Sequence, residues 1–306
     1  MVYDVIIIGA GPAGLAAGIY GKRAGFSVLI LDTSSISGGQ ILNTYEIDNY
    51  PGFPGATGES LAEAMRAHCD KLGVEFARGR VSSIVDNGDI KELVTKKETF
   101  SAKTVVLATG ASNKKLGCPG EEELSGMGVS YCATCDGAFF KEKEVAVVGG
   151  GDVALEDAVY LSRFCKKVYL IHRRDEFRGA KILQNQAKEA DNIEFVFDSQ
   201  VKEIRGSESV ESLLVVNTKT NVESELKIDG VFIAVGTMPN TGNIQGLPDM
   251  DQRGYIIADE TCETSQKGIF AAGDVRTKQL RQVITATADG ANAIASVQRY
   301  FQNSNY

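Results

Sequence analysis

The sequence predicts an α/β protein with two Rossmann-like dinucleotide-binding domains, the second inserted into the first. A pattern of strand, glycine turn and helix occurs twice, at residues 4–17 (DVIIIGAGPAGLAA) and 144–157 (EVAVVGGGDVALED). Each copy is followed by another apolar strand, which completes a βαβ nucleotide-binding unit. A later apolar strand that ends at a glycine also recurs, at 104–110 and 231–236. The segment after about residue 244 has no counterpart in the second copy, so we expect it to return to the first domain.

Two polar, turn-rich segments follow the recurring later strands and indicate where the domains meet. They are 111–118 (ASNKKLGC) and 237–243 (TMPNTGN). The apolar strands between helical segments favour parallel sheets that are covered on both faces. We therefore predict a discontinuous first domain over 1–113 and 244–306, and an inserted second domain over 114–243.

The composition is that of an ordinary globular protein of about two domains. Of the 306 residues, 43% are hydrophobic and 24% are charged. The formal net charge of -8 argues against a general nucleic-acid binder, which needs clustered basic surface. No apolar run approaches the length of about 20 residues that a membrane span requires. We expect a cytoplasmic protein that binds neither nucleic acid nor membrane.

The first glycine turn, GAGPAG, fits the G-x-G-x-x-G fingerprint between a strand and a helix. In this fingerprint the first glycine permits a tight turn, the second lets a pyrophosphate approach, and the third allows close helix–strand packing. The helix N-terminus offers unpaired N–H groups to the phosphates. An acid ends the next strand, where it would accept hydrogen bonds from a ribose. The alternative is a turn without a ligand, but the register favours a dinucleotide site formed by Gly9, Gly11, Pro12, Ala13, Gly14 and Asp32.

The second glycine turn repeats the fingerprint in its G-x-G-x-x-A form, but arginines replace the acid. The next strand ends in HRRDEFR, at 172–178. Guanidinium groups bind phosphate in a bidentate way, which favours NADP(H) over NAD. The alternative is a solvated basic cluster, and His172 is either a ligand contact or a surface residue at the strand end. The predicted contacts are Gly149, Gly151, Asp152, Ala154, His172, Arg173, Arg174 and Arg178.

Two of the six cysteines, Cys132 and Cys135, form a CxxC motif in the segment YCATCDG. In a reducing compartment such a pair is catalytic, redox-sensing or metal-binding. A pair at a helix start can close a small disulfide, and Asp136 could transfer the proton that dithiol chemistry needs. Zinc normally requires four ligands, and the sequence has no second CxxC and no nearby HxxxH. The motif therefore predicts a redox pair, and we expect no special role for the other cysteines, Cys69, Cys118, Cys165 and Cys262.

The motifs and their order resemble the low-molecular-weight thioredoxin reductases of bacteria over essentially the full length. The shared motifs are GAGPAG, GGQ at 38–40, CATCD, GGGDVALE, HRRDEFR, and AAGDV followed by RQ at 281–282. The resemblance implies that FAD binds at the first turn and NADPH at the second. It implies that electrons pass from NADPH through FAD to the Cys132–Cys135 pair and then to a thioredoxin-like disulfide. It also implies a homodimer, and a domain rotation about the two connections.

The resemblance further assigns residues to the flavin and to the cysteine chemistry. Cys135 would face the flavin, Cys132 would attack the partner's disulfide, and Asp136 would act as acid–base residue. A helix beginning near Gln282 would direct its positive end at the isoalloxazine ring, although 281–301 also reads as an amphipathic surface helix. The implied flavin contacts are Gly39, Gln40, Asn49, Gly273, Asp274, Arg281, Gln282 and Val283.

Three related functions stay as alternatives. The first is a sibling reductase that serves a peroxidase-linked or glutaredoxin-like partner. The second takes electrons from ferredoxin, a group expected to lose the second fingerprint and its arginines, which this chain retains. The third is a flavin-containing redox sensor with little turnover, against which the CxxC motif beside an intact NADP fingerprint argues.

Overall fold

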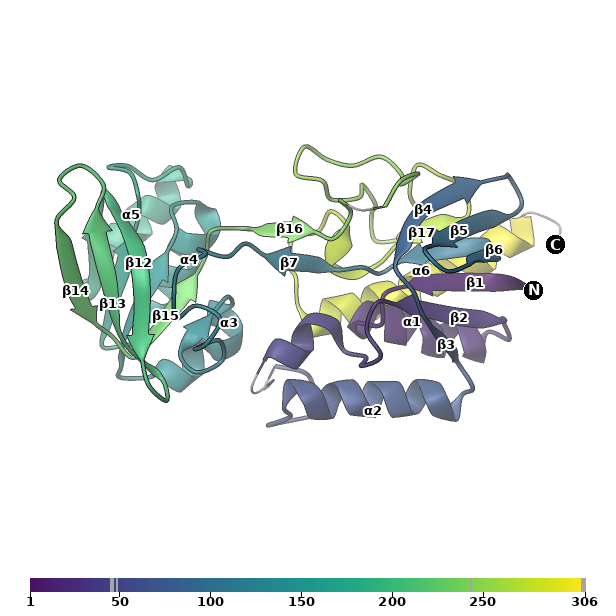
Figure 1. Ribbon diagram of the computed structural model, residues 1–306, viewed down its shortest axis with the longest axis horizontal. Helices are drawn as coiled ribbons and strands as arrows, with labels where there is room; N and C mark the ends of the chain where they lie inside the picture. The colour runs from purple at the N-terminus through teal and green to yellow at the C-terminus, as the bar shows by residue number, and fades with distance from the viewer. Residues whose placement is uncertain (45–46, 48, 243, 304–306) are drawn as a thin grey trace. The chain divides into compact units, whose positions relative to one another are not determined.

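The chain divides into two compact units (Figure 1). Unit 1 comprises Met1–Ser112 and Met238–Tyr306, and unit 2 comprises Asn113–Thr237. Each unit contains a largely parallel sheet with helices, which confirms the predicted α/β class. The computed structural model describes residues 1–44, 47, 49–242 and 244–303.

The second boundary lies earlier in the chain than the sequence suggested. We placed it after residue 243, whereas unit 2 ends at Thr237. The reason is that Asn240 bonds to unit 1: its backbone N–H donates to Gly110 O, and its side-chain oxygen accepts from Ser112 Oγ at 2.8 Å. Residue 243 itself lies outside the described residues.

Unit 1 is built on a seven-stranded sheet in the order β3-β2-β1-β6-β5-β4, with β17 paired to the second half of β6. The pairs among β3, β2, β1, β6 and β17 are parallel, whereas β5 and β4 are antiparallel additions that the sequence analysis did not predict. Because β17 pairs with β6, the C-terminal part of the chain returns to the first sheet, as expected. The strands are β1 (Val2–Ile8), β2 (Val28–Asp32), β3 (Glu75–Arg78), β4 (Val81–Asp86), β5 (Lys91–Thr95), β6 (Thr99–Leu107) and β17 (Ile269–Ala271).

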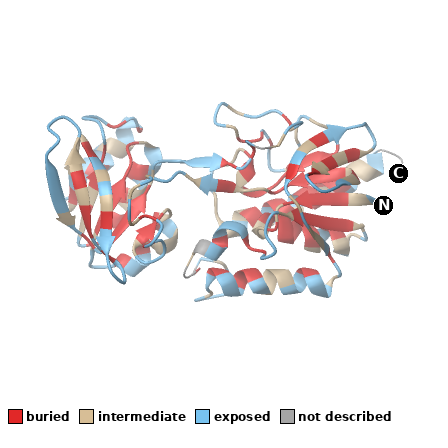
Figure 2. Cartoon of the chain, in the orientation of Figure 1, coloured by how far each residue is buried: buried red, intermediate tan, exposed pale blue. Residues whose placement is uncertain are grey.

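The side chains of β1 alternate between two apolar cores on opposite faces of this sheet. Val5 and Ile7 join the core that contains Ile294 of the last helix. Ile6 and Ile8 join the core on the other face. Burial on both faces explains why β1 is an unbroken apolar run in its second half. Figure 2 shows the same concentration of buried residues in the strands of each unit.

The helices of unit 1 hold the glycine turn against the C-terminal segment. Helix α6 packs along α1, and a Cβ at Gly290 would lie only 2.2 Å from Ala13 O. Glycine therefore permits this close approach, and α6 is buried along one side rather than being a surface helix only. The helical elements are α1 (Pro12–Arg23), α2 (Gly58–Lys71), α6 (Val283–Asn303) and the short 3₁₀ turns η1 (Gly39–Asn43) and η3 (Gly273–Val275).

Unit 2 contains a five-stranded parallel sheet in the order β11-β10-β9-β15-β8. Its strands are β8 (Val129–Ser130), β9 (Glu144–Val148), β10 (Lys167–Ile171), β11 (Ile193–Val196) and β15 (Gly230–Ile233). Its helical elements are α3 (Ala133–Asp136), η2 (Gly137–Phe140), α4 (Asp152–Ser162) and α5 (Lys181–Glu189).

A second, antiparallel sheet in unit 2 was not predicted. It comprises β12 (Ser199–Gly206), β13 (Val210–Asn217) and β14 (Glu223–Lys227). Buried residues such as Leu213 and Val215 alternate with more exposed ones along β13. This period of two is typical of a sheet with one covered face.

The two segments that connect the units pair with each other. Strand β7 (Ala111–Asn113) leads out of unit 1, and β16 (Thr237–Pro239) leads back into it. They form a two-stranded sheet. No helix in the described part of the chain is long and apolar enough to cross a membrane.

Candidate functional site: a disulfide and two glycine turns

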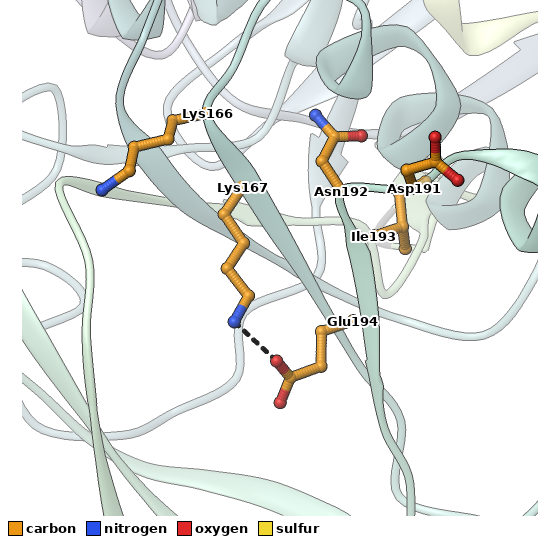
Figure 3. Close-up of a pocket in the computed structure, with 6 residues that line it drawn as sticks. All are labelled: Lys166, Lys167, Asp191, Asn192, Ile193 and Glu194. Carbon is orange, nitrogen blue, oxygen red and sulfur yellow. Dashed lines mark ion pairs between the residues drawn. The ribbon is translucent and has the colours of Figure 1, made fainter.

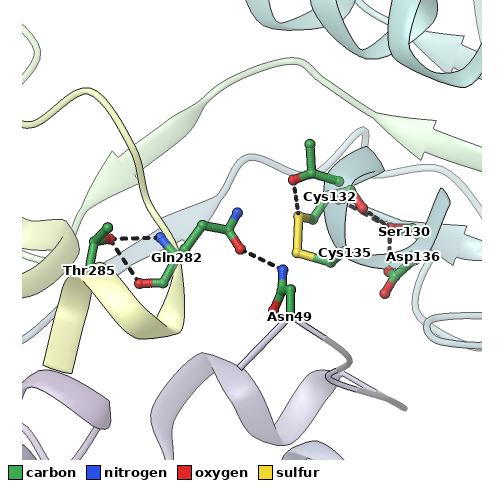
Figure 4. Close-up of a disulfide and its surroundings, with 8 residues drawn as sticks. Asn49, Ser130, Cys132, Cys135, Asp136, Gln282 and Thr285 are labelled. Atoms are coloured by element: carbon green, nitrogen blue, oxygen red, sulfur yellow. Dashed lines mark hydrogen bonds between the residues drawn. A yellow bond between two sulfur atoms is a disulfide. The ribbon is translucent and has the colours of Figure 1, made fainter. Parts of the chain in front are cut away.

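Cys132 and Cys135 form a disulfide at the start of α3 in unit 2 (Figure 4). Their Cα atoms are 5.3 Å apart. The N–H groups of Cys135 and Asp136 donate to Cys132 O at 3.2 and 3.1 Å, so the turn itself holds the two sulfur atoms together. Helix α3 has only four residues, so any stabilisation of a thiolate by a helix N-terminus comes from a single turn.

Asp136 follows the pair and is linked to it through Ser130, the last residue of β8. Ser130 Oγ donates to Asp136 Oδ2 at 2.6 Å and accepts from the Cys132 N–H at 3.1 Å. Burial raises the pKa of Asp136 above its ordinary value, and the Ser130 hydrogen bond partly opposes this. A carboxyl group with a raised pKa beside a disulfide is suited to proton transfer. Ser130 was not among the predicted site residues, because an isolated serine carries no pattern.

A buried carboxylate, Glu121, holds the residue before the pair. Its two oxygens accept from Leu116 N at 2.9 Å, from Gly117 N at 2.7 Å and from the Tyr131 hydroxyl at 2.8 Å. Burial and the hydrogen bond to this carboxylate raise the pKa of Tyr131. Glu121 therefore fixes the segment that enters unit 2 to the backbone next to Cys132. Glu121 was not among the site residues predicted from the sequence.

The other four cysteines are thiols unsuited to nucleophilic chemistry. Cys69, Cys165 and Cys262 are buried and Cys118 is half-buried. Burial raises the pKa of Cys69 and Cys262 to about 12 and that of Cys118 and Cys165 to about 11. The thiolate is the reactive form, so these groups are unreactive near neutral pH.

The first glycine turn has the shape that a pyrophosphate requires. Gly9 has a φ of 110°, and a Cβ there would lie 2.3 Å from Ala108 O; a Cβ at Gly14 would lie 1.9 Å from Gly9 O. At Gly11 the nearest atom to a Cβ is 3.9 Å away, so the turn is open at this point. The backbone can therefore be approached at Gly11, while the other two glycines close the turn against β6 and α1.

Asp32 lies at the carboxyl end of β2 and reaches this turn. Its Oδ2 accepts from Ala10 N at 2.5 Å and its Oδ1 accepts from Ser34 N at 2.8 Å. Gly39 has a φ of 59°, and a Cβ there would lie 3.3 Å from the Gly11 Cα. The turn, Asp32 and the segment beginning at Gly39 are thus brought together in unit 1.

Asp274 and Arg281 each have a buried polar atom without a hydrogen-bond partner among the described residues. Asp274 Oδ1 and Arg281 Nε make no hydrogen bond to any described residue. Burial raises the pKa of Asp274, against the opposing charges of Lys278 and Arg281. The Arg281 guanidinium lies 4.3 Å from the centre of the Tyr255 ring. Such unsatisfied groups are rare in folded chains and fit a bound polar ligand.

Other predicted flavin contacts lie at the start of α6. Gln282 precedes this helix, and its side-chain oxygen accepts from Asn49 Nδ2 at 3.0 Å (Figure 4). The Gln282 N–H donates to Thr285 Oγ1 at 3.1 Å. The helix begins at Val283, as expected, and Gln40 is exposed in η1. These residues all belong to unit 1.

An unpredicted group of charges supports the loop at Gly273. Asp289 of α6 accepts from Gly273 N at 2.8 Å, from Arg276 Nε at 2.8 Å and Nη2 at 2.7 Å, and from Lys278 Nζ at 2.9 Å. The three charged side chains are between 2% and 5% exposed. Burial opposes the charge of Asp289, but Arg276 and Lys278 hold its pKa below the ordinary value.

The second glycine turn differs in detail from the first. A Cβ at Gly149 would lie 2.6 Å from the Ala154 Cβ, whereas nothing lies within 4 Å of a Cβ at Gly151. Asp152 Oδ1 accepts from Ala180 N at 2.7 Å, and Arg178 N donates to Gly150 O at 2.8 Å. The arginine segment is thus fixed to the turn by backbone hydrogen bonds.

His172 is buried beneath this turn, at 6% exposure, so the interpretation as a surface residue is wrong. A Cβ at Gly150 would lie 2.2 Å from its ring, and its Nε2 has no hydrogen-bond partner among the described residues. Burial and then the charges of Arg178, Arg174 and Arg173 lower its pKa. These three arginines are exposed, as a phosphate site at the surface would require.

A shallow hollow on unit 2 is not a candidate site. It has a volume of about 470 Å³ and lies where β10 and β11 begin (Figure 3). Ligands of parallel sheets bind at the carboxyl ends of the strands instead. The lysines in the hollow are already paired, Lys166 with Glu144 at 2.7 Å and Lys167 with Glu194 at 2.6 Å. Nor do the described residues contain a cluster of side chains able to hold a metal ion.

Comparison with known proteins connects these features to one family. Residues 3–290 match the family described as pyridine nucleotide-disulphide oxidoreductase. A thioredoxin reductase of Bacillus subtilis (strain 168) is 47% identical over 302 residues, which is 98% of this chain and 95% of that protein. The crystal structure of thioredoxin reductase from Streptococcus pyogenes MGAS5005 is 46% identical, with a TM-score of 0.94 over 99% of each chain. A thioredoxin reductase from Giardia duodenalis is 35% identical, with a TM-score of 0.92 over 98% of this chain and 99% of that one.

Proposed function

Because the chain belongs to the pyridine nucleotide-disulphide oxidoreductase family, we propose that it acts as an NADPH-dependent flavoprotein thioredoxin reductase. The observation that carries the proposal is the Cys132–Cys135 disulfide in the same unit as a glycine turn lined by arginines. A second glycine turn with an acidic strand end lies in unit 1. Nucleotide sites of two kinds in one chain with a reversible sulfur pair suit electron transfer from a nicotinamide to a disulfide.

FAD in unit 1 and NADPH in unit 2 would supply the hydride chemistry that brings two electrons to the disulfide. The unsatisfied atoms of Asp274 and Arg281, and the open backbone at Gly11, fit the flavin site. The unsatisfied His172 Nε2 fits the NADPH site. The proposed FAD contacts are Gly9, Gly11, Pro12, Ala13, Gly14, Asp32, Gly39, Gln40, Asn49, Gly273, Asp274, Arg281, Gln282 and Val283. The proposed NADPH contacts are Gly149, Gly151, Asp152, Ala154, His172, Arg173, Arg174 and Arg178.

The sulfur chemistry follows from the three residues at α3. Once the pair is a dithiol, the Cys132 thiolate attacks one sulfur of the oxidised thioredoxin and forms a mixed disulfide, while the released thioredoxin sulfur takes a proton. Cys135 then attacks the Cys132 sulfur, which restores the Cys132–Cys135 disulfide and releases thioredoxin as a dithiol. Asp136, with its raised pKa, donates or accepts the protons of these steps.

The Cys132–Cys135 pair cannot contact the flavin and a thioredoxin molecule at the same time. We therefore expect unit 2 to rotate about β7 and β16. A covalent crosslink between the units should then stop turnover, and full activity in a crosslinked enzyme would exclude the rotation. The protein is further proposed to be a cytoplasmic homodimer. Sedimentation of the purified protein tests the dimer.

Colour provides the direct test of the proposed function. The purified protein should be yellow, lose its colour with NADPH, and regain it when oxidised thioredoxin is added. The same assay with reduced ferredoxin in place of NADPH, and with glutaredoxin-like or peroxidase-linked partners in place of thioredoxin, separates the related reductases. A flavin sensor would bleach but show no sustained turnover. A protein that binds no flavin on reconstitution would overturn the proposal.

The arginines should set the preference for NADPH. Replacing Arg173 and Arg174 together with alanine should raise the KM for NADPH roughly 10- to 100-fold with little change in kcat, because charge-assisted hydrogen bonds to a phosphate contribute about 1.5–3 kcal/mol. The KM for NADH should be unaffected. Arg163→Ala is the matched control, because this exposed arginine lies just after α4, at the end opposite the glycine turn. Equal effects on both nucleotides would contradict a 2′-phosphate site.

A further inference from the structure

Ser130 is placed between the acid and the backbone of the redox pair. It is 6% exposed at the end of β8. Its hydroxyl lies 2.6 Å from Asp136 Oδ2, 3.1 Å from the Cys132 N–H nitrogen and 3.4 Å from Cys132 O (Figure 4). A hydroxyl has one proton and two acceptor positions. Ser130 can therefore donate to only one of the two oxygens at a time, while it accepts from Cys132.

This geometry satisfies Asp136 in both of its protonation states. When Asp136 is charged, Ser130 donates to its Oδ2 at the short distance. When Asp136 is protonated, its own O–H can donate to Ser130 Oγ, and the serine proton turns to Cys132 O. In either state the buried hydroxyl keeps its partners, whereas an alanine would leave the charged carboxylate without this donor. Losing such a partner in a buried place is unfavourable.

We propose that Ser130 is a positioning residue that lets Asp136 release and take up the proton exchanged with the Cys132–Cys135 pair while every polar group stays hydrogen-bonded. The inference deepens the proposed function and rests on it, because it assigns a partner to the acid–base residue. Among the described residues, the hydrogen bonds of Ser130 go to Asp136 and to the Cys132 backbone and not to a sulfur atom.

The surroundings of Asp136 support this assignment. Burial raises its pKa, and the hydrogen bond from Ser130 is the one contribution that lowers it. The elements with the most contacts to α3 are η2, which has no titratable side chain, and α4, and β8 contributes Ser130. Burial and then the charge of Glu156 raise the pKa of Asp157 in α4 to about 7. The titratable side chains of α4 are Asp152, Glu156, Asp157 and Tyr160.

The test uses reduction of the disulfide by dithiothreitol in the flavin-loaded enzyme, without NADPH or thioredoxin. A dithiothreitol thiolate attacks one cysteine sulfur, the Cys132–Cys135 bond breaks, and its electron pair goes to the other sulfur, which takes the proton of Asp136. The second dithiothreitol thiolate then closes the reagent's ring and releases the remaining cysteine. The rate, divided by the fraction of reagent thiolate, should fall as pH rises through the pKa of Asp136.

We expect Ser130→Ala to move this fall to higher pH, because the charged carboxylate loses its hydrogen bond. Ser130→Thr keeps a hydroxyl and should restore the wild-type midpoint. Asp136→Asn should lower the rate about 100-fold and remove the fall. Adding Ser130→Ala to Asp136→Asn should change neither the reduction rate nor its pH dependence any further. An Asp136→Asn enzyme whose rate still falls with the wild-type midpoint would overturn the inference.

Ser212→Ala is the matched control, because Ser212 is 7% exposed and also donates to a carboxylate, Glu225, at 2.8 Å, in the antiparallel sheet. It should leave the profile unchanged. A Ser130→Ala enzyme that is slower at every pH with an unmoved midpoint would overturn the inference, as would additive effects in the double variant. If Ser130→Ala does not fold, an altered midpoint in the Ser130→Thr enzyme also overturns it, and a preserved one supports it. Because thioredoxin is not used, failure to reduce thioredoxin would count against the proposed function alone.

Discussion

Replacing either Cys132 or Cys135 with serine will abolish NADPH-driven reduction of thioredoxin, by at least about 10⁴-fold. The two sulfurs act as one unit, because each step of the exchange uses a disulfide or a pair of thiols. A serine hydroxyl cannot form the disulfide that the structure contains. The loss should therefore be nearly complete in both single variants and no greater in the double variant.

The two single variants differ in which cysteine thiol each one keeps. Both should stay yellow and bleach with NADPH, because neither cysteine lies in unit 1 with the proposed flavin contacts. The Cys132→Ser enzyme keeps Cys135, the thiol that we assign to the flavin. The Cys135→Ser enzyme keeps Cys132, the thiol that attacks thioredoxin, and should therefore trap a mixed disulfide with thioredoxin. Gel electrophoresis without reductant detects this adduct.

Cys118→Ser is the matched control, because Cys118 lies in the same unit and burial raises its pKa to about 11. This variant should retain wild-type turnover. Retention of turnover in an enzyme that lacks both Cys132 and Cys135 would instead show that another group carries the electrons.

Asp289→Ala will strongly destabilise unit 1. Asp289 is the shared acceptor for two buried cations, Arg276 and Lys278, and for the Gly273 N–H. Removing one partner of a buried ion pair costs about 3–5 kcal/mol, because the other charge remains buried. Of its ion pairs, Arg276 would keep the one at 3.4 Å with the exposed Glu260. For a unit of this size we expect a fall in Tm of roughly 10 °C. The variant should also bind FAD more weakly, because the loop of Gly273 loses its support.

The pH dependence of this effect has a definite sign. The pKa of Asp289 is lowered in the folded chain, so its contribution is present above the unfolded value of about 3.9 and is lost as pH falls through the lower folded value. The gap in Tm between wild type and variant should therefore narrow in acid. Glu223→Ala removes an exposed ion pair with Lys202 and should change stability by less than about 1 kcal/mol. A similar small change for Asp289→Ala would show that the buried network is not stabilising.

Much of this architecture could be predicted from the sequence because nucleotide-binding turns leave local patterns. Gly9 and Gly14 are required by backbone contacts within the turn itself, and the two fingerprints lie next to the strands that flank them. The CxxC pair is also local, since its sulfurs are joined through one turn. The return of the C-terminal segment could be predicted only because that segment lacked a partner elsewhere.

The groups that were missed depend on contacts between residues ten or more positions apart, beyond the reach of a local motif. Glu121 and Tyr131 are ten positions apart. Arg276 precedes α6 and forms an ion pair with Asp289 inside that helix. Nothing in their spacing indicates that these charges are buried together. The misreading of His172 has the same origin, because its burial depends on Gly150, which leaves room for the ring. The alternation from Leu213 to Val216 in β13 does carry a local strand signal.

The pairing of β7 with β16 brings the entry and exit of unit 2 to the same place. A polypeptide covering 113–237 alone would thus have neighbouring ends and an uninterrupted core, the usual conditions for independent production of an inserted module. The two segments of unit 1, Met1–Ser112 and Met238–Tyr306, could likewise be joined by a few glycines in place of unit 2. Insertion into an existing nucleotide-binding protein is therefore a simple evolutionary route to this chain, because it changes the host at a single surface point.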